Sequence, residues 1–412
     1  MKRVFVGWWQ VVVSMLNQAV APGTIITCFS VIAFPIQKEF ATSRTVLMLT
    51  MTLTYLVNGL ANPLLGAAMD RYSVRKILMG GAVCLAAGYF ALSFSTSIIQ
   101  VYLAYGLLLA LALTALGPLS YSTLLPRWFV RRRARAVGLT VAGYALGGMV
   151  LPIIFQKLIE LFGWRDAVRL FACFVAVVVL PIIAWLVVDR PADVGLFADD
   201  ETQPPPVEAG DSIDERQTTR ELMAKMNFWV VTLAVGLVLC GVSGVLGNLV
   251  PIVTSKGFTA SQGAVVVSCF SAGSLTLKLL YAAIGDRLTP RLGLSGGLMF
   301  FLLSNFSFLD ADTYPMLLIA SFLLGGAVGV SLPLWSYLAA RLFGARNVGR
   351  VFGLMTLVVM PISLVAPPVL GRIYDVTGNY DYGFIGFIAL ALAMFVLVSR
   401  LRMAVQAAIP SS

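Results

Sequence analysis

The sequence predicts an all-α membrane protein with twelve transmembrane helices in two pseudo-symmetric six-helix bundles. Of its 412 residues, 59% are hydrophobic and only 12% are charged, and the mean hydropathy is +0.90. Soluble domains carry roughly 25% charged residues. Apolar runs long enough for a helix to cross a bilayer, about 20 residues, recur along the whole chain. They are too continuous for the roughly ten-residue alternating strands of an outer-membrane barrel.

The apolar runs predict the individual helices in order. Most of the runs are separated from the next by a short loop that carries charged residues. The predicted spans are 7–34, 45–69, 76–94, 98–125, 135–162, 167–188, 227–253, 261–284, 291–309, 313–340, 349–371 and 383–402.

The middle of the chain, residues 189–226, differs in composition from the spans on either side. It is acidic, rich in proline and poor in apolar residues, which is typical of a linker. The sequence therefore predicts three parts: an N-terminal six-helix bundle at 1–188, a cytoplasmic linker at 189–226, and a C-terminal six-helix bundle at 227–412.

The positions of the basic residues predict the orientation in the bilayer. If both termini are cytoplasmic, 21 of the 29 Lys and Arg residues lie on the inner side, seven lie outside, and Lys278 lies within a span. Cytoplasmic loops carry such an excess of positive charge. Short loops and small size suggest a multi-pass protein of a bacterial inner membrane. The net charge of +10 resides in these loops, so we do not expect nucleic acid as a partner.

The two halves of the sequence resemble each other at matched positions. GAAMDRYSVRK at 66–76 follows the second predicted span, and AAIGDRLTPR at 282–291 follows the eighth. RWFVRRRARAVGL at 127–139 precedes the fifth span, and RLFGARNVGRVFGL at 341–354 precedes the eleventh. Parallel six-span repeats of this kind place a binding site near the midplane, between the halves.

The loop after the second span resembles the signature loop of the major facilitator superfamily, in which a glycine and an Asp-Arg pair precede basic residues. The resemblance implies that this loop and its second-half copy latch the inner gate. The alternative is simple neutralisation of charge at a helix end. The residues concerned are Asp70, Arg71, Arg75, Asp286 and Arg287.

The segment 128–147, WFVRRRARAVGLTVAGYALG, resembles the fifth-span signature of the monocarboxylate transporter family. It departs from that pattern at Arg135, Thr140 and Tyr144. Glycines spaced four residues apart let another helix approach closely, whatever the substrate. The matching positions that we expect to matter are Arg131, Arg132, Arg133, Gly143 and Gly147.

Lys278 is the charged residue that the sequence places well inside a span. Histidine is absent, and every acidic residue falls near a span end or in a loop. A charge at this depth costs at least about 2.5–3.5 kcal/mol on insertion scales and is normally kept for function. Ser271 and Ser274 lie on the same helical face, seven and four residues earlier. The alternative is a lysine that snorkels or packs between helices.

Lys278 precedes Asp286 by eight residues. Monocarboxylate transporters, and the similar oxalate/formate antiporters, carry an arginine at this position. The resemblance therefore implies that Lys278 pairs with the carboxylate of a small organic anion. Oxalate exchangers have a second cation in the eleventh span, and 351–371 here contains no charge, so a single carboxylate is expected. Proton-coupled symport, anion exchange and uniport all remain open.

Polar side chains within the spans are further candidates for substrate contact. In this superfamily the first, fourth, seventh and tenth spans surround the cavity. Each candidate has the alternative of bonding to a neighbouring helix. The candidates beside Lys278 are Asn17, Tyr121, Asn248, Ser274, Trp335 and Tyr337.

We therefore expect a secondary transporter of small organic monocarboxylates that works by alternating access as a monomer. No nucleophile–base pair or metal-ligand cluster is evident in the sequence, so we expect neither an enzyme nor a metal or other cofactor, and the coupling species is a proton or a counter-anion. A drug exporter would require an intramembrane acid to meet cationic drugs. A receptor would require a sizeable soluble output domain.

Overall fold

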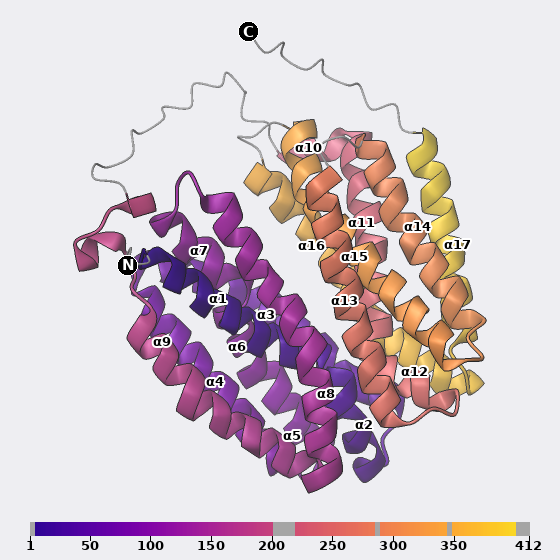
Figure 1. Cartoon of the computed structure of the whole chain (residues 1–412). Helices are drawn as coiled ribbons and strands as arrows, with labels where there is room; N and C mark the ends of the chain where they lie inside the picture. The colour runs from indigo at the N-terminus through magenta and orange to yellow at the C-terminus, as the bar shows by residue number, and fades with distance from the viewer. Residues whose placement is uncertain (1–4, 201–218, 285–288, 344–347, 401–412) are drawn as a thin grey trace. The chain divides into compact units, whose positions relative to one another are not determined.

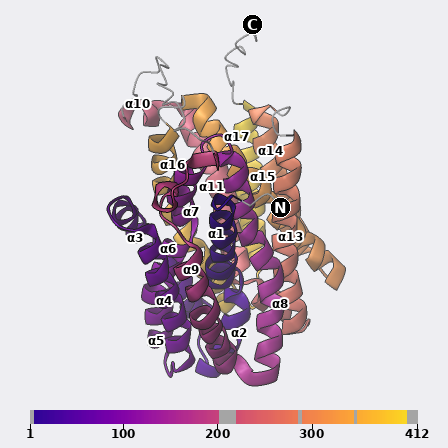
Figure 2. The same ribbon diagram turned by 60° about the vertical axis from the view of Figure 1, so that its left-hand side comes forward.

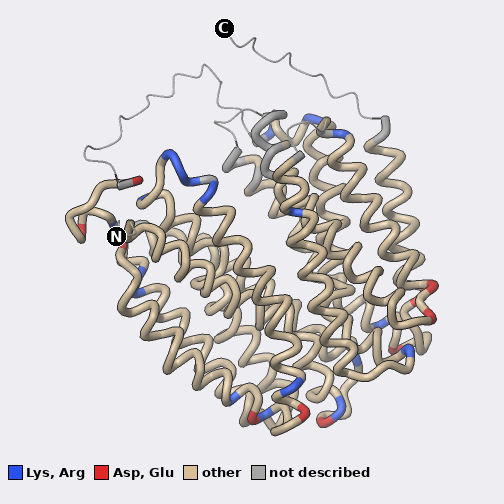
Figure 3. The backbone as a smooth tube through the Cα atoms, in the orientation of Figure 1, with Lys and Arg blue, Asp and Glu red and all other residues tan. Residues whose placement is uncertain are grey.

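The computed structural model describes residues 5–200, 219–284, 289–343 and 348–400, and these residues form helices joined by short turns, with no β-strand among them (Figure 1). The expectation of an all-α chain is confirmed. Charged residues in this described part gather at helix ends and in loops, and the helix interiors are mostly uncharged (Figure 3).

The N-terminal half contains nine helices. π-helical turns at Gly23–Thr27, Ala104–Leu109 and Val175–Val179 join some of them into longer spans. The helices are α1 (Gly7–Pro22), α2 (Phe29–Phe40), α3 (Arg44–Arg71), α4 (Val74–Ser93), α5 (Ile98–Leu103), α6 (Ala110–Leu116), α7 (Pro118–Trp128), α8 (Arg133–Phe174) and α9 (Leu180–Leu186).

The described residues of the C-terminal half add eight helices. α10 is a single short helix in the region predicted as a linker. These helices are α10 (Thr219–Ala224), α11 (Met226–Gly247), α12 (Leu249–Ser255), α13 (Ala260–Ile284), α14 (Pro290–Leu309), α15 (Tyr314–Phe343), α16 (Val348–Thr377) and α17 (Asp381–Arg400).

Local sequence sets several of the helix boundaries. Ser43 and Ser73 accept hydrogen bonds from the amides of Val46 and Lys76, which caps the starts of α3 and α4. Gly163 has φ +80° inside α8, a conformation that glycine adopts without steric cost. The bend at Gly163 separates the fifth and sixth predicted spans.

Ten helical stretches of the described chain are long and apolar enough to cross a membrane. One of these, Arg135–Leu186, contains two predicted spans on either side of Gly163. α3 is not among the ten, because its threonines and asparagines lower its hydropathy. Counting α3 and both parts of the bent stretch gives the twelve spans that the sequence predicts.

Close contacts divide the chain into two units that are not the two sequence halves. The first unit comprises Met1–Asp211, Ser243–Ala272 and Leu364–Tyr380, and the second comprises Ser212–Val242, Gly273–Ser363 and Asp381–Ser412. Within the first unit, α1 packs on α8, and α4 packs on both α6 and α8 (Figure 2). The division at 188 and 227 that the sequence predicts remains a prediction.

The start of the predicted linker is folded onto the first unit. Two short 3₁₀ turns occupy Pro191–Val194 and Ala198–Asp200. The carboxylate of Asp199 accepts hydrogen bonds from the amides of Val130 and Arg131 at 2.8 and 2.7 Å, and from that of Arg132 at 3.3 Å. The composition of 189–226 indicated a flexible connection. The hydrogen bonds of Asp199 show that the start of this segment is ordered.

Candidate functional site

α1 and α8 lie unusually close together at two glycines. A Cβ atom on Gly143 would lie 2.2 Å from the carbonyl oxygen of Met15, and one on Gly147 would lie 2.4 Å from that of Ala19. Both distances are far below van der Waals contact, so a side chain at either position would force the helices apart. The spacing of four residues gave the expectation of a close helix contact, and the structure identifies α1 as the partner.

Three residues with hydroxyl groups lie beside this contact, and we call Thr27, Tyr144 and Ser271 the hydroxyl cluster. Thr27 Oγ1 donates to the Tyr144 hydroxyl at 3.4 Å. A Cβ atom on Gly148 would lie 2.2 Å from Ser271 Oγ and 3.2 Å from Thr27 Cγ2. The absent side chain at Gly148 therefore makes the space in which the cluster forms. All of these residues belong to the first unit.

The cluster was only partly foreseen. Tyr144 stands where the monocarboxylate family has a small hydroxyl residue, and its longer side chain reaches Thr27. Ser271 was placed on the polar face of α13. Thr27 was missed, because a single threonine in an apolar span carries no signal in the sequence.

Asn17 and Gln18 on α1 are buried polar residues of the same unit. Asn17 is 1% exposed, and neither amide atom has a hydrogen-bond partner; the side-chain oxygen of Gln18 also has none. Leaving such a group buried and unsatisfied costs about 1–3 kcal/mol. These atoms are therefore places where a water molecule or a polar substrate group would be stabilised. Tyr121 on α7 is partly exposed, and no hydrogen bond joins it to Asn17 in the described chain.

The side chain of Asn248 is hydrogen-bonded to neighbouring segments of the first unit. Its side-chain nitrogen donates to the carbonyl oxygens of Gly244 at 2.9 Å and Pro367 at 3.3 Å, and its oxygen accepts from the Tyr380 hydroxyl at 3.5 Å. The residue is fully buried at the junction of α11 and α12. Because these contacts occupy the amide, we leave Asn248 out of the candidate site.

Lys278 lies in the second unit on α13, beside a close contact with α15. A Cβ atom on Gly329 would lie 2.5 Å from the carbonyl oxygen of Ser274 and 3.0 Å from the amide nitrogen of Lys278. The Ser274 side chain is buried, and that of Lys278 is half-buried. Among the described residues, no acidic group lies within ion-pair distance of Lys278. The backbone from Ser274 to Lys278 is thus held in place by the contact with Gly329. The ammonium group of Lys278 has no anionic partner among the described residues.

Two further candidates lie on α15. Trp335 is buried, and its indole N–H points to the sulfur of Met355 at 2.9 Å. Tyr337 belongs to the same helix, and its side chain lies outside the described residues. Trp335 thus contributes to packing between α15 and α16 within the second unit.

The signature loops are described only in part. Arg71 is exposed at the end of α3, and the side chain of Asp70 lies outside the described residues, as do Asp286 and Arg287. The Arg75 amide donates to Asp189 at 2.9 Å, and its guanidinium donates to the carbonyl of Ala184.

The basic run at the start of α8 is anchored through its backbone. Arg131, Arg132 and Arg133 are exposed, and Asp199 binds the amides of the first two. The proposed latch is therefore untested. The described contacts of these loops are with α9 and the segment after it, and Arg127 also donates to the carbonyl of Met69 at 3.0 Å, which joins the two loops.

At the opposite end of the first unit, Asp375 of α16 caps α3. Its carboxylate accepts from the amides of Arg44 and Thr45 at 3.0 and 2.9 Å and from the Thr45 hydroxyl at 2.5 Å. The Arg44 guanidinium lies 3.3 Å from the centre of the Tyr374 ring and donates to the Tyr380 hydroxyl. We call this arrangement the α3–α16 clamp. Sequence reasoning missed it, because the partners are more than 300 residues apart.

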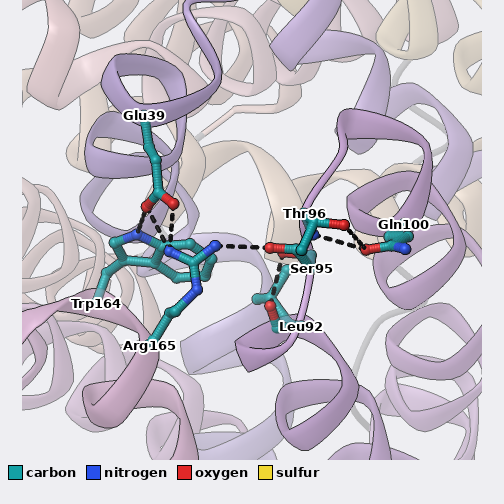
Figure 4. A network of polar contacts seen from close by, with 7 residues as sticks. All are labelled: Glu39, Leu92, Ser95, Thr96, Gln100, Trp164 and Arg165. Atoms are coloured by element: carbon teal, nitrogen blue, oxygen red, sulfur yellow. Dashed lines mark hydrogen bonds and ion pairs between the residues drawn. The ribbon is translucent and has the colours of Figure 1, made fainter.

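A second contact at the same end is shown in Figure 4. Glu39 at the end of α2 accepts from the indole N–H of Trp164 at 2.7 Å and from Arg165 at 2.5 Å. Arg165 also donates to the carbonyl of Ser95 at 2.7 Å. These contacts tie α2 and α4 to the turn at Gly163.

Comparison with known proteins supports a transporter fold. The model of the Major Facilitator Superfamily matches residues 13–265 and 231–411. Two solved structures are similar over 95% or more of this chain. A bacterial homolog to the human lysosomal transporter Spinster, in an inward-facing and occupied conformation, has a TM-score of 0.71 at 17% identity and is covered over 96% of its length. A mutant of the peptide transporter POT in complex with alafosfalin has a TM-score of 0.73 at 13% identity, with 94% covered.

Among curated proteins, monocarboxylate transporter 12 of Mus musculus is 23% identical, over 92% of this chain and 82% of its own length. Human monocarboxylate transporter 11 is 25% identical, over 86% and 74%. The agnestins efflux protein AgnL12 of Paecilomyces divaricatus is 26% identical, over 82% and 74%. These relatives are transporters by name, not enzymes. Since the family model matches nearly the whole chain, this protein belongs to the Major Facilitator Superfamily.

Proposed function

We propose that this protein is a secondary active transporter of small organic monocarboxylates, such as lactate, pyruvate or related anions, and that it works by alternating access. The observation that carries the proposal is Lys278, a half-buried cation on a transmembrane helix with no acidic partner in the described chain. An ionisable group inside a membrane is expensive and is retained where it binds or moves an ion. A substrate carboxylate supplies the missing charge.

The named relatives agree with this choice of substrate. Several are monocarboxylate transporters, and each matches most of this chain. A lysine offers a compact, strongly hydrated point charge, where an arginine would offer a planar bidentate fork. We therefore expect Lys278 to accept a range of monocarboxylates and to discriminate weakly between their apolar tails.

Other polar groups contribute to selectivity under this proposal. The hydroxyl cluster offers donors from the segment after α1 and from α8 and α13, and the Asn17 amide is buried without a partner. Tyr121, Ser274, Trp335 and Tyr337 are the other predicted candidates that we retain, and Asn248 is the predicted residue that we leave out because its amide is already bonded. Because none of the retained side chains carries a charge, each would contribute by hydrogen bonding to the substrate or by limiting its size and shape.

We propose proton-coupled symport, with Lys278 gaining a proton before the anion binds. No acidic residue lies at the middle of a described span, so a carboxylate relay has no support there. Exchange of one organic anion for another is the second candidate, and it needs no proton. We further propose a monomer in the inner membrane. Both termini are proposed to be cytoplasmic, because the predicted inner loops carry most of the Lys and Arg residues.

The test is uptake of radiolabelled lactate, pyruvate and benzoate into proteoliposomes, with and without an inward proton gradient. Wild type should show uptake that the gradient stimulates. Lys278→Gln, which removes the charge, should lower the initial rate at least about a hundredfold, the effect of ~2.7 kcal/mol of lost carboxylate binding. Lys278→Arg keeps the positive charge but cannot release its proton, so it should retain carboxylate uptake that the proton gradient no longer stimulates.

Lys256→Gln is the matched control, because Lys256 is a half-buried lysine, as Lys278 is, and lies in the turn before α13. It should transport at the wild-type rate. Full activity in Lys278→Gln would exclude the proposed role of this residue. Uptake only into vesicles preloaded with an anion would establish exchange in place of symport, and the absence of any carboxylate uptake by folded protein would favour an efflux function like that named for AgnL12.

A further inference from the structure

A recess of about 500 Å³ opens at the end of the first unit, beside the α3–α16 clamp. This volume lies within the range of small-molecule sites, about 300–1,000 Å³. Residues from five segments line it, including Phe34, Lys38, Arg44, Thr254, Thr259 and Tyr374. All of them belong to the first unit.

The charges in the recess are positive. Lys38 and Arg44 both line it, and no acidic side chain does. Lys38 is exposed, forms no ion pair among the described residues, and holds its ammonium 4.6 Å from the centre of the Phe34 ring. Arg44 is 8% exposed and is held by the Tyr374 ring and the Tyr380 hydroxyl, which are uncharged partners.

The nearest acidic groups are already occupied. Asp375 binds two backbone amides and a hydroxyl at the start of α3, and Glu39 binds Trp164 and Arg165. Neither carboxylate has a hydrogen bond to the side-chain nitrogen atoms of Lys38 or Arg44. The recess therefore keeps an unneutralised positive charge.

The remaining lining suits an organic anion better than an inorganic one. Aromatic rings of Phe34 and Tyr374 offer apolar surface beside the two cations, whereas the Thr259 hydroxyl is already bonded to Gln262. α13, a helix of 25 residues, begins at Ala260, which also lines the recess. The positive end of its macrodipole adds to the attraction for an anion.

We infer that this recess is a docking site for an organic monocarboxylate, separate from Lys278. The choice of ligand rests on the proposed function. Under the proposed orientation, the loops next to the recess, at 41–43, 256–259 and 378–380, lie outside the cytoplasm. An anion held here is concentrated at the outer face, beside the clamp that joins α3 to α16.

The experiment measures equilibrium binding of radiolabelled benzoate to the purified full-length protein, with Lys278→Gln as the background. In this background the Lys278 site is disabled, and residual binding reports the recess. Adding Lys38→Gln should weaken this binding about fivefold, the size of a partly exposed ion pair. Adding Lys38→Arg should preserve it. Adding Lys256→Gln should leave it unchanged, because Lys256 is a half-buried lysine at the same end and does not line the recess.

The outcomes separate the two proposals. If wild type binds benzoate and Lys278→Gln does not, the recess is not a docking site and the proposed function stands. If Lys38→Gln alone abolishes binding and Lys278→Gln has no effect, the recess stands and the role of Lys278 fails. Equal weakening by Lys38→Gln and Lys256→Gln would indicate long-range attraction only and would overturn the docking site. If folded wild type binds no benzoate, both proposals fail.

Discussion

The α3–α16 clamp and the Lys278 segment differ in whether their charged side chains have partners within the protein. In the clamp, each oxygen of Asp375 accepts hydrogen bonds, and the Arg44 guanidinium lies over the Tyr374 ring. On α13, the backbone around Lys278 is tightly packed against Gly329, but its ammonium group has no acidic partner in the described chain. The carboxylate of Asp375 is satisfied within the protein, whereas the ammonium of Lys278 is satisfied only when an anion is added.

This difference distinguishes a contact that stabilises the fold from a group that is available to bind a ligand. A charge satisfied within the protein gains nothing from a ligand, so the clamp can stabilise one arrangement of the helices. A charge that folding leaves unsatisfied gains most when an anion arrives, which is what a transport site requires. Three substitutions test this comparison, beyond the lysine variants described above.

The largest effect is expected for Gly329→Val on α15. The new Cβ atom would lie 2.5 Å from Ser274 O and 3.0 Å from Lys278 N, so α13 must shift. Overpacking of this kind costs typically about 1–3 kcal/mol, and displacement of Lys278 should lower carboxylate uptake at least about tenfold. Initial uptake rates and the melting temperature measure the two effects.

Gly353→Val is the matched control for this substitution. Gly353 lies on α16 in the same unit, and no atom lies within 4 Å of the position that its Cβ would take. It should transport and melt like wild type. Normal uptake by Gly329→Val would show that the backbone contact does not position Lys278.

A smaller effect is expected for Asp375→Asn in the clamp. The amide keeps one acceptor but loses the negative charge at the start of α3, which should cost about 0.5–2 kcal/mol. The clamp should then open more often. The measurement is alkylation of Met48→Cys in a chain without its native cysteines, because Met48 is fully buried on α3, and labelling should rise severalfold.

Asp312→Asn controls for the loss of a negative charge, since Asp312 is exposed in the turn between α14 and α15. It should not change the labelling rate. Unaltered labelling in Asp375→Asn as well would mean that the clamp does not hold the two helices together.

The smallest effect is expected for Glu39→Gln. Glu39 and Arg165 form an ion pair whose side chains are 41% and 31% exposed, and such pairs contribute about 0–1 kcal/mol. Glutamine can still accept from the Trp164 indole. The melting temperature should fall by no more than a few degrees, and the difference should shrink in high salt. A larger, salt-independent loss would show that this contact, like the clamp, is a main support of this end of the first unit.

Much of the architecture followed from local sequence. The period and length of the apolar runs predicted the spans, since a helix that crosses a bilayer needs about 20 apolar residues. Gly143 and Gly147 indicated a close helix contact by their spacing alone. The bend at Gly163 also lies between two predicted spans. The folded start of the linker did not follow, because the Asp199 anchor depends on the amides of 130–132, which composition does not reveal.

The sequence by itself determined which residues are helical, where the chain is interrupted, and that a single cation would lie within a span without a local acid. Tertiary structure decided how the polar residues are used. It placed Asn248 at a helix junction, joined Thr27 to Tyr144 beside Ser271, and set Asp375 on the start of α3. The physical reason is that helix formation depends on neighbours within a few residues, whereas hydrogen bonds between distant segments depend on how the helices pack.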